Sequence, residues 1–397
     1  MGMARLTTMA FHGENMVPTA LDLLRRAESD PEDAAALLDL ATIHLLMGHE
    51  EAGDAFQAKA LGLQQVYRDQ SATADGSGPR LLAFAAPGNL MSNVPIQFLI
   101  ENSDIQLDLL YVIPGVDLPE RVPAHDMAMV VVGESDENRE ILERIAALVD
   151  LWPCPPVLND PRKVLRLSRD GVSTLLAGAP GIRIPATTRV DPETLARLGR
   201  GEITLTELLP DGTYPIIVRP LDSHAGKGLS KLDDSSALDI YMAATPAEAY
   251  YLSSFVDYRG AGGLFRKYRI VMIAGHPYVC HMAVSSHWMI HYLNADMRES
   301  AEKRAEEAQA FATFDEDFAA RHAGAFAAMH ERIGLEYFAM DCAETPDGRL
   351  LVFEADTAMI VHAMDPPDIF PYKAPQMHRI FRAFQDMLRG IAAAKRA

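Results

Sequence analysis

Apolar residues recur at helical spacing in two stretches near the beginning of the sequence. Between residues 35 and 45, and again between 52 and 63, they fall every three or four positions, which predicts a helix in each stretch. Gly48 separates the two stretches, and Asp30-Pro31-Glu32-Asp33 supplies a capping side chain, a proline and acidic residues where the first helix would begin. We therefore predict two helices within residues 17–70, arranged as a helical hairpin.

Three short apolar runs follow, and each predicts a strand. They span residues 81–86, 107–113 and 127–132, and the intervals between them are long enough for crossover connections. We therefore expect a small parallel α/β sheet, with a helix over about residues 138–149 after the third run. Residues 70–79 have the small and polar composition of a linker, so we expect a domain boundary there.

Two helical patterns lie toward the C-terminus. The charged segment 299–309 predicts a surface helix. Residues 372–395 predict a helix with one apolar side, which is more typical of a core than of an interface. The apolar positions on that side are Met377, Ile380, Phe381, Phe384, Met387 and Leu388.

Composition and charge exclude several classes of protein. The length of 397 residues, with 49% hydrophobic and 23% charged residues, is typical of a folded protein of two or three domains. The net charge of −19 argues against nucleic acid and anionic membrane as partners. Three cysteines without a CxxC pair argue against a zinc finger or a disulfide framework and favour a cytoplasmic location. No apolar run approaches the roughly 18 residues of a membrane span, and we expect no export signal.

Segment 214–229 joins a β-branched apolar run to a loop of small residues. Arg219 lies at the end of the run, and Ser-His-Ala-Gly-Lys-Gly occupies 223–228 directly after it. Glycines let backbone N–H groups approach an anion, and a cation on the strand adds positive charge. The pattern predicts a phosphate-binding loop, although the Walker spacing is absent. The alternative is a hairpin turn with a solvated lysine.

Acidic residues gather in segment 334–356. Asp347-Gly348 between two apolar runs predicts a β-hairpin with Asp341 on its first strand. Glu354 and Asp356 lie two apart on its second strand, so their side chains share a face. Because Mg²⁺ prefers carboxylate oxygens, the pattern predicts a metal site; the alternative is that the acids are solvated.

Segment 281–294 is rich in groups that hydrogen-bond polar substrates. His287 and His291 have the spacing of a helical zinc pair, but no HExxH glutamate accompanies them. Substrate contacts or a general base are therefore the functional interpretation, structural histidines are the alternative, and zinc is a third possibility. The candidate substrate residues are His281, Ser286, His287, His291, Asn294 and, past Asp356, His362.

Taken in order, these segments resemble the ATP-grasp superfamily of carboxylate-amine ligases, which includes glutathione synthetases and D-alanine ligases. The resemblance covers roughly residues 79–387 and has four parts. Residues 158–185 resemble the start of the family's nucleotide domains, and residues 214–229 resemble its phosphate-covering lid. Residues 251–275 resemble the adenine hinge and the next sheet. Asp341, Glu354 and Asp356 resemble the metal-binding acids.

The resemblance implies an α/β and α+β architecture, the ATP-grasp fold. A pre-ATP-grasp α/β domain would span 79–157, and the two subdomains that clamp the nucleotide would span 158–255 and 256–397. The helical hairpin of residues 1–75 resembles one tetratricopeptide unit. A single such unit cannot bury both of its faces, so it would dock on the rest of the chain or on a second subunit of a homodimer.

The implied activity is that of an ADP-producing ligase that uses ATP with Mg²⁺ or Mn²⁺. ATP phosphorylates a substrate carboxylate, and an amine captures the acyl phosphate to form an amide, or peptide-like, bond on an amino acid or peptide. An ATP-grasp phosphotransferase and a non-catalytic nucleotide-binding scaffold are the alternatives.

The resemblance also assigns residues to roles. The acids Asp341, Glu354 and Asp356 would bind the metal, and Arg269 and Arg219 would act on the transferred phosphate or the carboxylate. The predicted nucleotide residues are Arg169, Arg219, Ser223, His224, Gly226, Lys227 and Gly228 for the phosphates, and Ser253, Ser254, Phe255, Val256 and Asp257 for adenine and ribose.

Three positions depart from the family pattern. Arg219 stands where lysine is usual, Arg169 lies near the place of another nucleotide lysine, and Asp356 stands where asparagine is common. Arginine keeps its charge and can hold a phosphate through two hydrogen bonds, so ATP binding is still expected.

Overall fold

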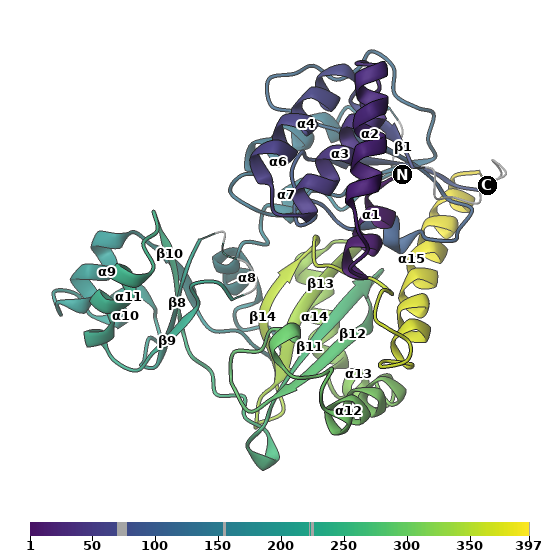
Figure 1. The fold of residues 1–397 in the computed structure, drawn as a ribbon. Coiled ribbons are helices and arrows are strands. Elements are labelled where there is room, and N and C mark those ends of the chain that lie inside the picture. The colour runs from purple at the N-terminus through teal and green to yellow at the C-terminus, as the bar shows by residue number, and fades with distance from the viewer. Residues whose placement is uncertain (70–77, 154–155, 222, 224–225, 397) are drawn as a thin grey trace. The chain divides into compact units, whose positions relative to one another are not determined.

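Figure 1 shows the fold in a computed structural model, which describes residues 1–69, 78–153, 156–221, 223 and 226–396. Most of the predicted linker, residues 70–77, lies outside the described residues. The chain divides into two compact units, each described by itself below. The first unit comprises Met1–Leu165, Leu335–Phe338 and Asp356–Ala397, and the second comprises Arg166–Gly334 and Ala339–Ala355. No described helix is long and apolar enough to cross a membrane.

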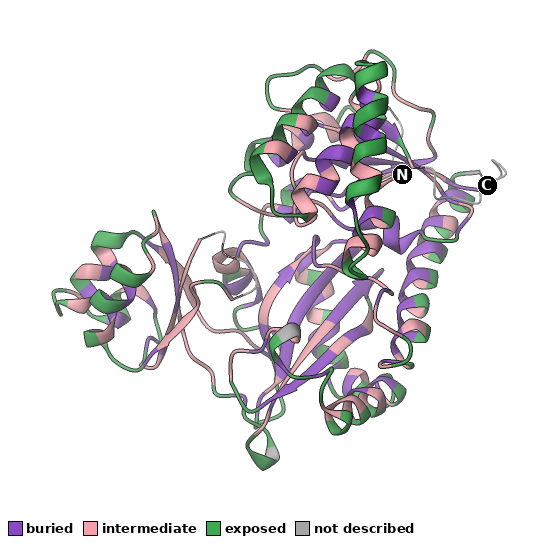
Figure 2. Ribbon diagram, viewed as in Figure 1, coloured by how far each residue is buried: buried purple, intermediate pink, exposed green. Residues whose placement is uncertain are grey.

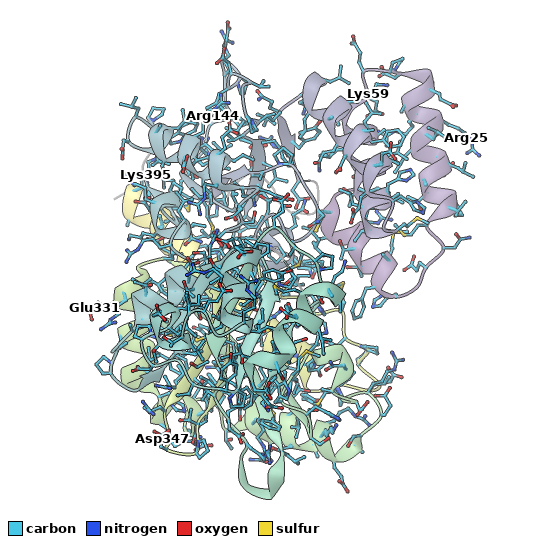
Figure 3. All side chains as sticks on the ribbon, turned by 90° about the vertical axis from the view of Figure 1, so that its left-hand side faces the viewer. Arg25, Lys59, Arg144, Glu331, Asp347 and Lys395 are labelled. Carbon is cyan, nitrogen blue, oxygen red and sulfur yellow. The ribbon has the colours of Figure 1, made fainter. Side chains whose placement is uncertain are left out.

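The first unit begins with four helices around an apolar core. They are α1 (Met3–Phe11), α2 (Val17–Ser29), α3 (Ala34–Leu46) and α4 (Glu50–Leu63). The prediction of only two helices in residues 17–70 is wrong, because the buried Leu23 and Ala27, four residues apart, make α2 a helix of its own. The Asp33 side chain caps α3 by accepting a hydrogen bond from the Ala36 N–H at 2.9 Å. The start signal placed the cap ahead of Pro31, which is wrong because the helix begins only at Ala34. Figure 3 shows Arg25 and Lys59 pointing outward from α2 and α4.

The helices α3 and α4 pack closely because of one glycine. A Cβ atom on Gly53 would lie 2.6 Å from Cγ of Leu45, well inside van der Waals contact. Gly48, in the turn between the two helices, has a φ of 75°, which glycine adopts without strain. The two helices form the predicted hairpin, and its likeness to a tetratricopeptide unit stays a prediction.

A sheet of mostly parallel strands forms the centre of the first unit. Its order is β1-β3-β2-β4-β5, where β1 pairs antiparallel with β3 and the other neighbours are parallel. The strands are β1 (Val66–Arg68), β2 (Arg80–Ala85), β3 (Gln106–Tyr111), β4 (Met127–Val130) and β5 (Val157–Leu158). The three apolar runs are therefore confirmed as a parallel sheet. Because β3 and β4 lie on opposite sides of β2, the strand order reverses at the carboxyl end of β2.

The remaining helices of the first unit include the two that the sequence predicted most clearly. They are α5 (Ile96–Leu99), α6 (Arg139–Val149), α7 (Pro161–Val164) and α15 (Lys373–Arg396). Helix α6 confirms the helix predicted at 138–149. On α15 the predicted apolar side is buried, except that Met387 is half-buried, so its assignment to the core is confirmed.

The second unit contains an antiparallel sheet of order β7-β10-β8-β9. Its elements are β7 (Thr187–Val190), β8 (Ile216–Pro220), β9 (Ser230–Leu232), β10 (Tyr250–Ser254), α9 (Pro192–Gly199), α10 (Leu205–Leu208) and α11 (Leu238–Ala244). The three helices cover one face of the sheet (Figure 1). Ile216 and Val218 alternate with the less buried Ile217 and Arg219 along β8 and belong to the core beneath these helices.

A second sheet in this unit has the order β12-β11-β13-β14-β6. Its strands are β6 (Ile182–Arg183), β11 (Phe265–Ile273), β12 (His276–Ser285), β13 (Tyr337–Glu344) and β14 (Leu350–Asp356), and the nearby helices are α8 (Arg169–Leu176), α12 (Ala301–Ala312), α13 (Phe318–Arg321) and α14 (Ala323–Ile333). Figure 2 shows long buried stretches in β11, β12 and β13. The turn at Asp347-Gly348, where Gly348 has a φ of 78°, joins β13 to β14 and confirms the predicted hairpin. The α/β and α+β fold class is thereby confirmed.

Helix α12 is only partly the surface helix that its charge predicted. Glu307 is completely buried, and its carboxylate accepts hydrogen bonds from the Met282 N–H and the Tyr292 hydroxyl, both at 3.0 Å. The prediction is wrong at this residue because hydrogen bonds to a strand and a loop compensate the burial of the charge.

Candidate functional site

Three side chains form a row across the antiparallel sheet of the second unit. Tyr251 on β10 lies opposite Arg189 on β7 and opposite Arg219 on β8. Opposed residues on antiparallel strands project from the same face. Tyr250 and Leu252, on either side of Tyr251, belong to the apolar core under the helices. The alternation of side chains therefore places two arginines and a tyrosine on the face away from that core.

Helix α8 adds a third arginine to this row. Ser168 caps the helix by accepting a hydrogen bond from the Gly171 N–H at 3.2 Å, which leaves Arg169 in its first turn. The guanidinium carbon of Arg169 lies 6.0 Å from the centre of the Tyr251 ring, and that of Arg189 lies 5.3 Å from it. Two cations thus share one aromatic ring. Sequence reasoning missed Tyr251 and Arg189 because their proximity depends on strand pairing.

The surroundings of Arg219 disfavour its positive charge. Burial lowers the pKa of the Arg219 guanidinium to about 10, the charge of Arg169 contributes to this lowering, and Glu354 acts in the opposite direction. Arg169 and Arg219 thus concentrate positive charge beside Glu354, while the neighbouring Arg189 pairs with Asp170 at 3.2 Å, within a chain of net charge −19. Such a local concentration of positive charge favours an anion.

Arg219 also holds the loop that follows it. Its Nε donates to the Ser223 hydroxyl at 3.1 Å, and its Nη2 donates to the Ser223 carbonyl. Gly228 has a φ of 70°, and a Cβ there would lie 2.8 Å from Cδ of Pro220, so the loop requires glycine at this position. The segment is a hairpin between β8 and β9 with Lys227 exposed, as the alternative interpretation expects, and the predicted His224 lies outside the described residues.

A second group of charges surrounds Asp341 on β13, which is only 2% exposed. Lys267 Nζ donates to its Oδ2 at 2.8 Å, and Arg269 donates through Nε to Oδ1 at 2.8 Å and through Nη2 to Oδ2 at 3.2 Å. Burial by itself would raise the pKa of Asp341, but the charges of Arg269 and Lys267 outweigh it and hold this pKa well below its usual range. Lys267 was missed, although strand alternation from Arg269 places it on the same face.

Glu354 on β14 connects the two groups. It forms an ion pair with Arg169. Burial and the negative charge of Asp341 raise the pKa of Glu354, whereas Arg169, Arg219 and Lys267 lower it, and the net effect is a lowering. The structure therefore brings five of the predicted site residues into one electrostatic cluster. These residues are Arg169, Arg219, Arg269, Asp341 and Glu354.

Two of the three acids of the predicted metal site, Asp341 and Glu354, belong to the second unit. Asp341 and Glu354 offer the carboxylate oxygens that Mg²⁺ prefers, so this part of the donor set fits the ion. Asp356, the last residue of β14, belongs to the first unit. In the described part of the chain, no three His, Cys, Asp or Glu side chains are grouped closely enough to hold a metal by themselves.

The predicted substrate histidines separate into different surroundings. His281 on β12 lies opposite Arg269, and its charge contributes to the low pKa of Asp341. Burial lowers the pKa of His291, and the charges of Lys267 and Arg269 lower it further, so His291 faces the same cluster.

The other candidate substrate residues lie outside this cluster or in the first unit. Ser286, His287 and Asn294 are exposed, and residues 286–291 are not helical, so the four-residue spacing of His287 and His291 does not form a helical zinc pair. His362 belongs to the first unit, where its ring lies 5.2 Å from that of Phe11 and its Nδ1 accepts a hydrogen bond from the Met364 N–H at 3.1 Å.

The predicted adenine hinge begins where β10 ends. Ser253 and Ser254 close the strand, and the Phe255 N–H donates to the Pro215 carbonyl at 2.9 Å. The Phe255 ring packs edge-on at 5.6 Å from Trp288. Val256 is half-buried and Asp257 is exposed. A role of these residues in nucleotide binding stays a prediction.

Comparison with known proteins gives structural similarities at low sequence identity. No family model matches the sequence, and no curated protein matches it. The chain is similar to the RimK domain ATP-grasp protein from Sphaerobacter thermophilus (17% identity, 78% of this chain and 99% of that chain, TM-score 0.41). It is also similar to the VanG D-Ala:D-Ser ligase from Enterococcus faecalis (13% identity, 80% of this chain and 100% of that chain, TM-score 0.47). A further similar structure is the D-alanine–D-alanine ligase from Bacillus anthracis complexed with ATP (12% identity, 80% of this chain and 98% of that chain, TM-score 0.46).

Proposed function

We propose that the second unit binds ATP and that the protein is an ATP-dependent carboxylate-amine ligase. The observation that carries the proposal is the proximity of Arg219 to Arg169, which forms an ion pair with Glu354. A phosphate group would compensate this positive charge, and guanidinium groups bind phosphate through two parallel hydrogen bonds. The glycine-containing loop held by Arg219 would add backbone N–H groups to the same anion.

Asp341 and Glu354 would hold Mg²⁺, or Mn²⁺ in its place. The fit rests on the carboxylates of Asp341 and Glu354, which the described structure neutralises with Lys267, Arg269 and Arg169. The ion would supply charge neutralisation between the phosphates of ATP. Lys267 and Arg269 would keep Asp341 ionised, which a metal ligand requires.

The proposed reaction has two steps in which the protein positions and stabilises the reactants. A substrate carboxylate oxygen attacks the γ-phosphorus of ATP, the bond to the β-phosphate oxygen breaks, and ADP leaves. An amine then attacks the acyl carbon, releases inorganic phosphate and loses a proton, which gives an amide. Arg219 and Arg269 would stabilise the negative charge of the transferred phosphoryl group.

We propose an amino acid or a peptide as the substrate. The structures named above include a D-Ala:D-Ser ligase and a D-alanine–D-alanine ligase, and another similar structure is the ATP-grasp ligase PsnB complexed with a phosphomimetic variant of its minimal precursor, Mg and ADP. In this chain, His281 and His291 face the charged cluster and are the first candidates for substrate contacts.

Calorimetry with Mg²⁺-ATP tests nucleotide binding. We expect the wild-type protein to bind, Arg219→Gln to bind at least tenfold more weakly, and Arg200→Gln, a matched change in an exposed ion pair, to bind like the wild type. No binding to the folded wild-type protein would overturn the proposal.

A second measurement tests the reaction. ADP and phosphate release is measured with panels of amino acids and peptides, with Glu354→Gln as the inactive variant. ATP binding without amine-dependent phosphate release would contradict the ligase assignment. It would favour the scaffold alternative, to which the ion pairs on Asp341 and Glu354 already lend support.

A further inference from the structure

A cavity of about 390 Å³ lies inside the first unit, between the helices α1, α3 and α4 and the carboxyl end of the parallel sheet. It borders the loop after β2, where the strand order reverses, and this is the position at which α/β sheets bind ligands. A volume of a few hundred Å³ is typical of sites for small molecules.

The walls of this cavity are held by polar side chains that bond within the protein. Gln57 on α4 is 7% exposed, donates to the Gly88 carbonyl at 3.0 Å and accepts from the Gly88 N–H at 2.7 Å. Arg68 forms two hydrogen bonds to Asp108, both 2.9 Å long. Gln57 therefore fixes the helical layer to the loop after β2, and Arg68 has its own carboxylate partner.

Two other buried polar groups border the cavity without such partners. Gln97 and Thr7 are each 5% exposed. The Gln97 Nε2 donates to Asp69 at 3.2 Å, but among the described residues neither the Gln97 Oε1 nor the Thr7 Oγ1 has a hydrogen-bond partner. Buried polar atoms are normally paired, so these two atoms are candidates for hydrogen bonds to a bound molecule.

The chemistry of the lining indicates which ligand would fit. Two carboxylates, Asp39 and Asp69, border the cavity together with Gln97, and the cations that also border it are paired, Arg68 with Asp108 and the Met1 ammonium with Asp39. Asp39 accepts hydrogen bonds from that ammonium at 2.5 Å and from the Gly2 N–H at 3.1 Å, and its carboxylate has lone pairs for a further donor. Much of the remaining lining is apolar, and it includes Leu38, Leu45, Val94, Leu109 and Val131.

We propose that this cavity binds a small primary amine with an apolar body, of about the size of an amino-acid amide. The ammonium group donates to the Gln97 Oε1 and to the carboxylates of Asp39 and Asp69, and the apolar part packs between the helices and the sheet. The proposal rests on residues of the first unit and does not depend on nucleotide binding by the second.

Calorimetry on the full chain without nucleotide tests this proposal, with L-leucinamide and benzylamine as probes. The control compound is 4-methylpentanamide, which has the same apolar body as L-leucinamide but lacks the ammonium group. We expect at least one amine to bind and the control compound to bind at least tenfold more weakly. Gln97→Met and Asp39→Asn should each weaken amine binding at least tenfold. Asp22→Asn, a matched change on the outer side of α2, should leave it unchanged.

Thermal unfolding of each variant checks that it is folded. Should Asp39→Asn fail to fold, Gln97→Met decides the question. The proposal is overturned when neither amine binds the wild-type protein, when 4-methylpentanamide binds as tightly as L-leucinamide, or when the folded variants bind the amine as the wild type does.

Discussion

Arg169, in the first turn of α8, forms an ion pair with Glu354 on β14, and this pair connects the arginine row of one sheet to the acid group of the other. The same carboxylate is also the group that partly offsets the charge of Arg219. Glu354 is therefore the residue on which the balance of charge in the cluster depends.

Replacement of Glu354 by Gln should make the protein less stable and more responsive to anions. Without the carboxylate, two guanidinium groups lie close together uncompensated, and we expect the free energy of unfolding to fall by about 1–3 kcal/mol. Thermal unfolding at constant ionic strength, with and without pyrophosphate, measures both effects. Pyrophosphate should stabilise Glu354→Gln more than the wild type. Glu202→Gln, a change in an exposed ion pair, is the control, and an equal response of all three proteins would contradict the prediction.

Asp341→Asn should be strongly destabilising, because it leaves Lys267 and Arg269 without their buried counter-charge. Removal of one partner of a buried ion pair typically costs about 3–5 kcal/mol. Urea unfolding measures the loss. The double variant Asp341→Asn, Lys267→Met should be more stable than Asp341→Asn alone, since one of the two stranded cations is also removed. A double variant that is less stable than the single one would show that the charge balance is not the cause.

The low pKa of Asp341 also predicts how the stability of the protein depends on pH. The pKa of Asp341 is lower in the folded protein than the value of about 3.9 that an unfolded Asp has. As the pH falls below about 4, the unfolded chain binds this proton first, so the free energy of unfolding decreases. Unfolding measured between pH 7 and pH 3 should show this decrease. The slope should be shallower in Asp341→Asn, and identical slopes would exclude Asp341 as its source.

The ring of Tyr251 should contribute to stability and to nucleotide affinity. The ring lies under the guanidinium groups of Arg169 and Arg189, and such contacts contribute about 0.5–2 kcal/mol each. Tyr251→Leu should therefore lose more stability and more Mg²⁺-ATP affinity than Tyr251→Phe, which keeps the ring. Calorimetry and urea unfolding on the two variants provide the comparison. Equal losses in the two variants would point to the hydroxyl instead.

Gly53→Ala should destabilise the first unit although alanine favours helices. The new Cβ would meet the Leu45 side chain at 2.6 Å, and overpacking of this kind costs about 1–3 kcal/mol. The gain in helix propensity is at most about 1 kcal/mol. Gly62→Ala, on the same helix with nothing within 4 Å of the added atom, should be neutral or stabilising. Thermal unfolding of the two variants separates packing from propensity, and equal effects would contradict the close approach.

Several strands, turns and helices were predicted correctly, because they depend on residues that are close together in the sequence. The three apolar runs, the Asp347-Gly348 turn and the apolar side of α15 depend on periodicity and turn chemistry, and the structure confirms them. Helix α2 was missed as a separate element, although Ala20, Leu23 and Ala27 recur at helical spacing. The burial of Glu307 was not predictable from its charged neighbours, because its hydrogen-bond partners come from a strand and a loop.

The features of the candidate site likewise divide into those that local patterns predicted and those that depend on the tertiary structure. The sequence by itself determined that Arg219 precedes a glycine-containing loop and that Asp341 and Glu354 lie on the two strands of one hairpin, because strand alternation and turn residues act over a few positions. Only the tertiary structure decided that Arg169 pairs with Glu354, that Tyr251 lies under two arginines, and that Lys267 and Arg269 share Asp341. These contacts join residues as much as 185 positions apart. They depend on the pairing of strands and the placement of α8, which no local pattern specifies.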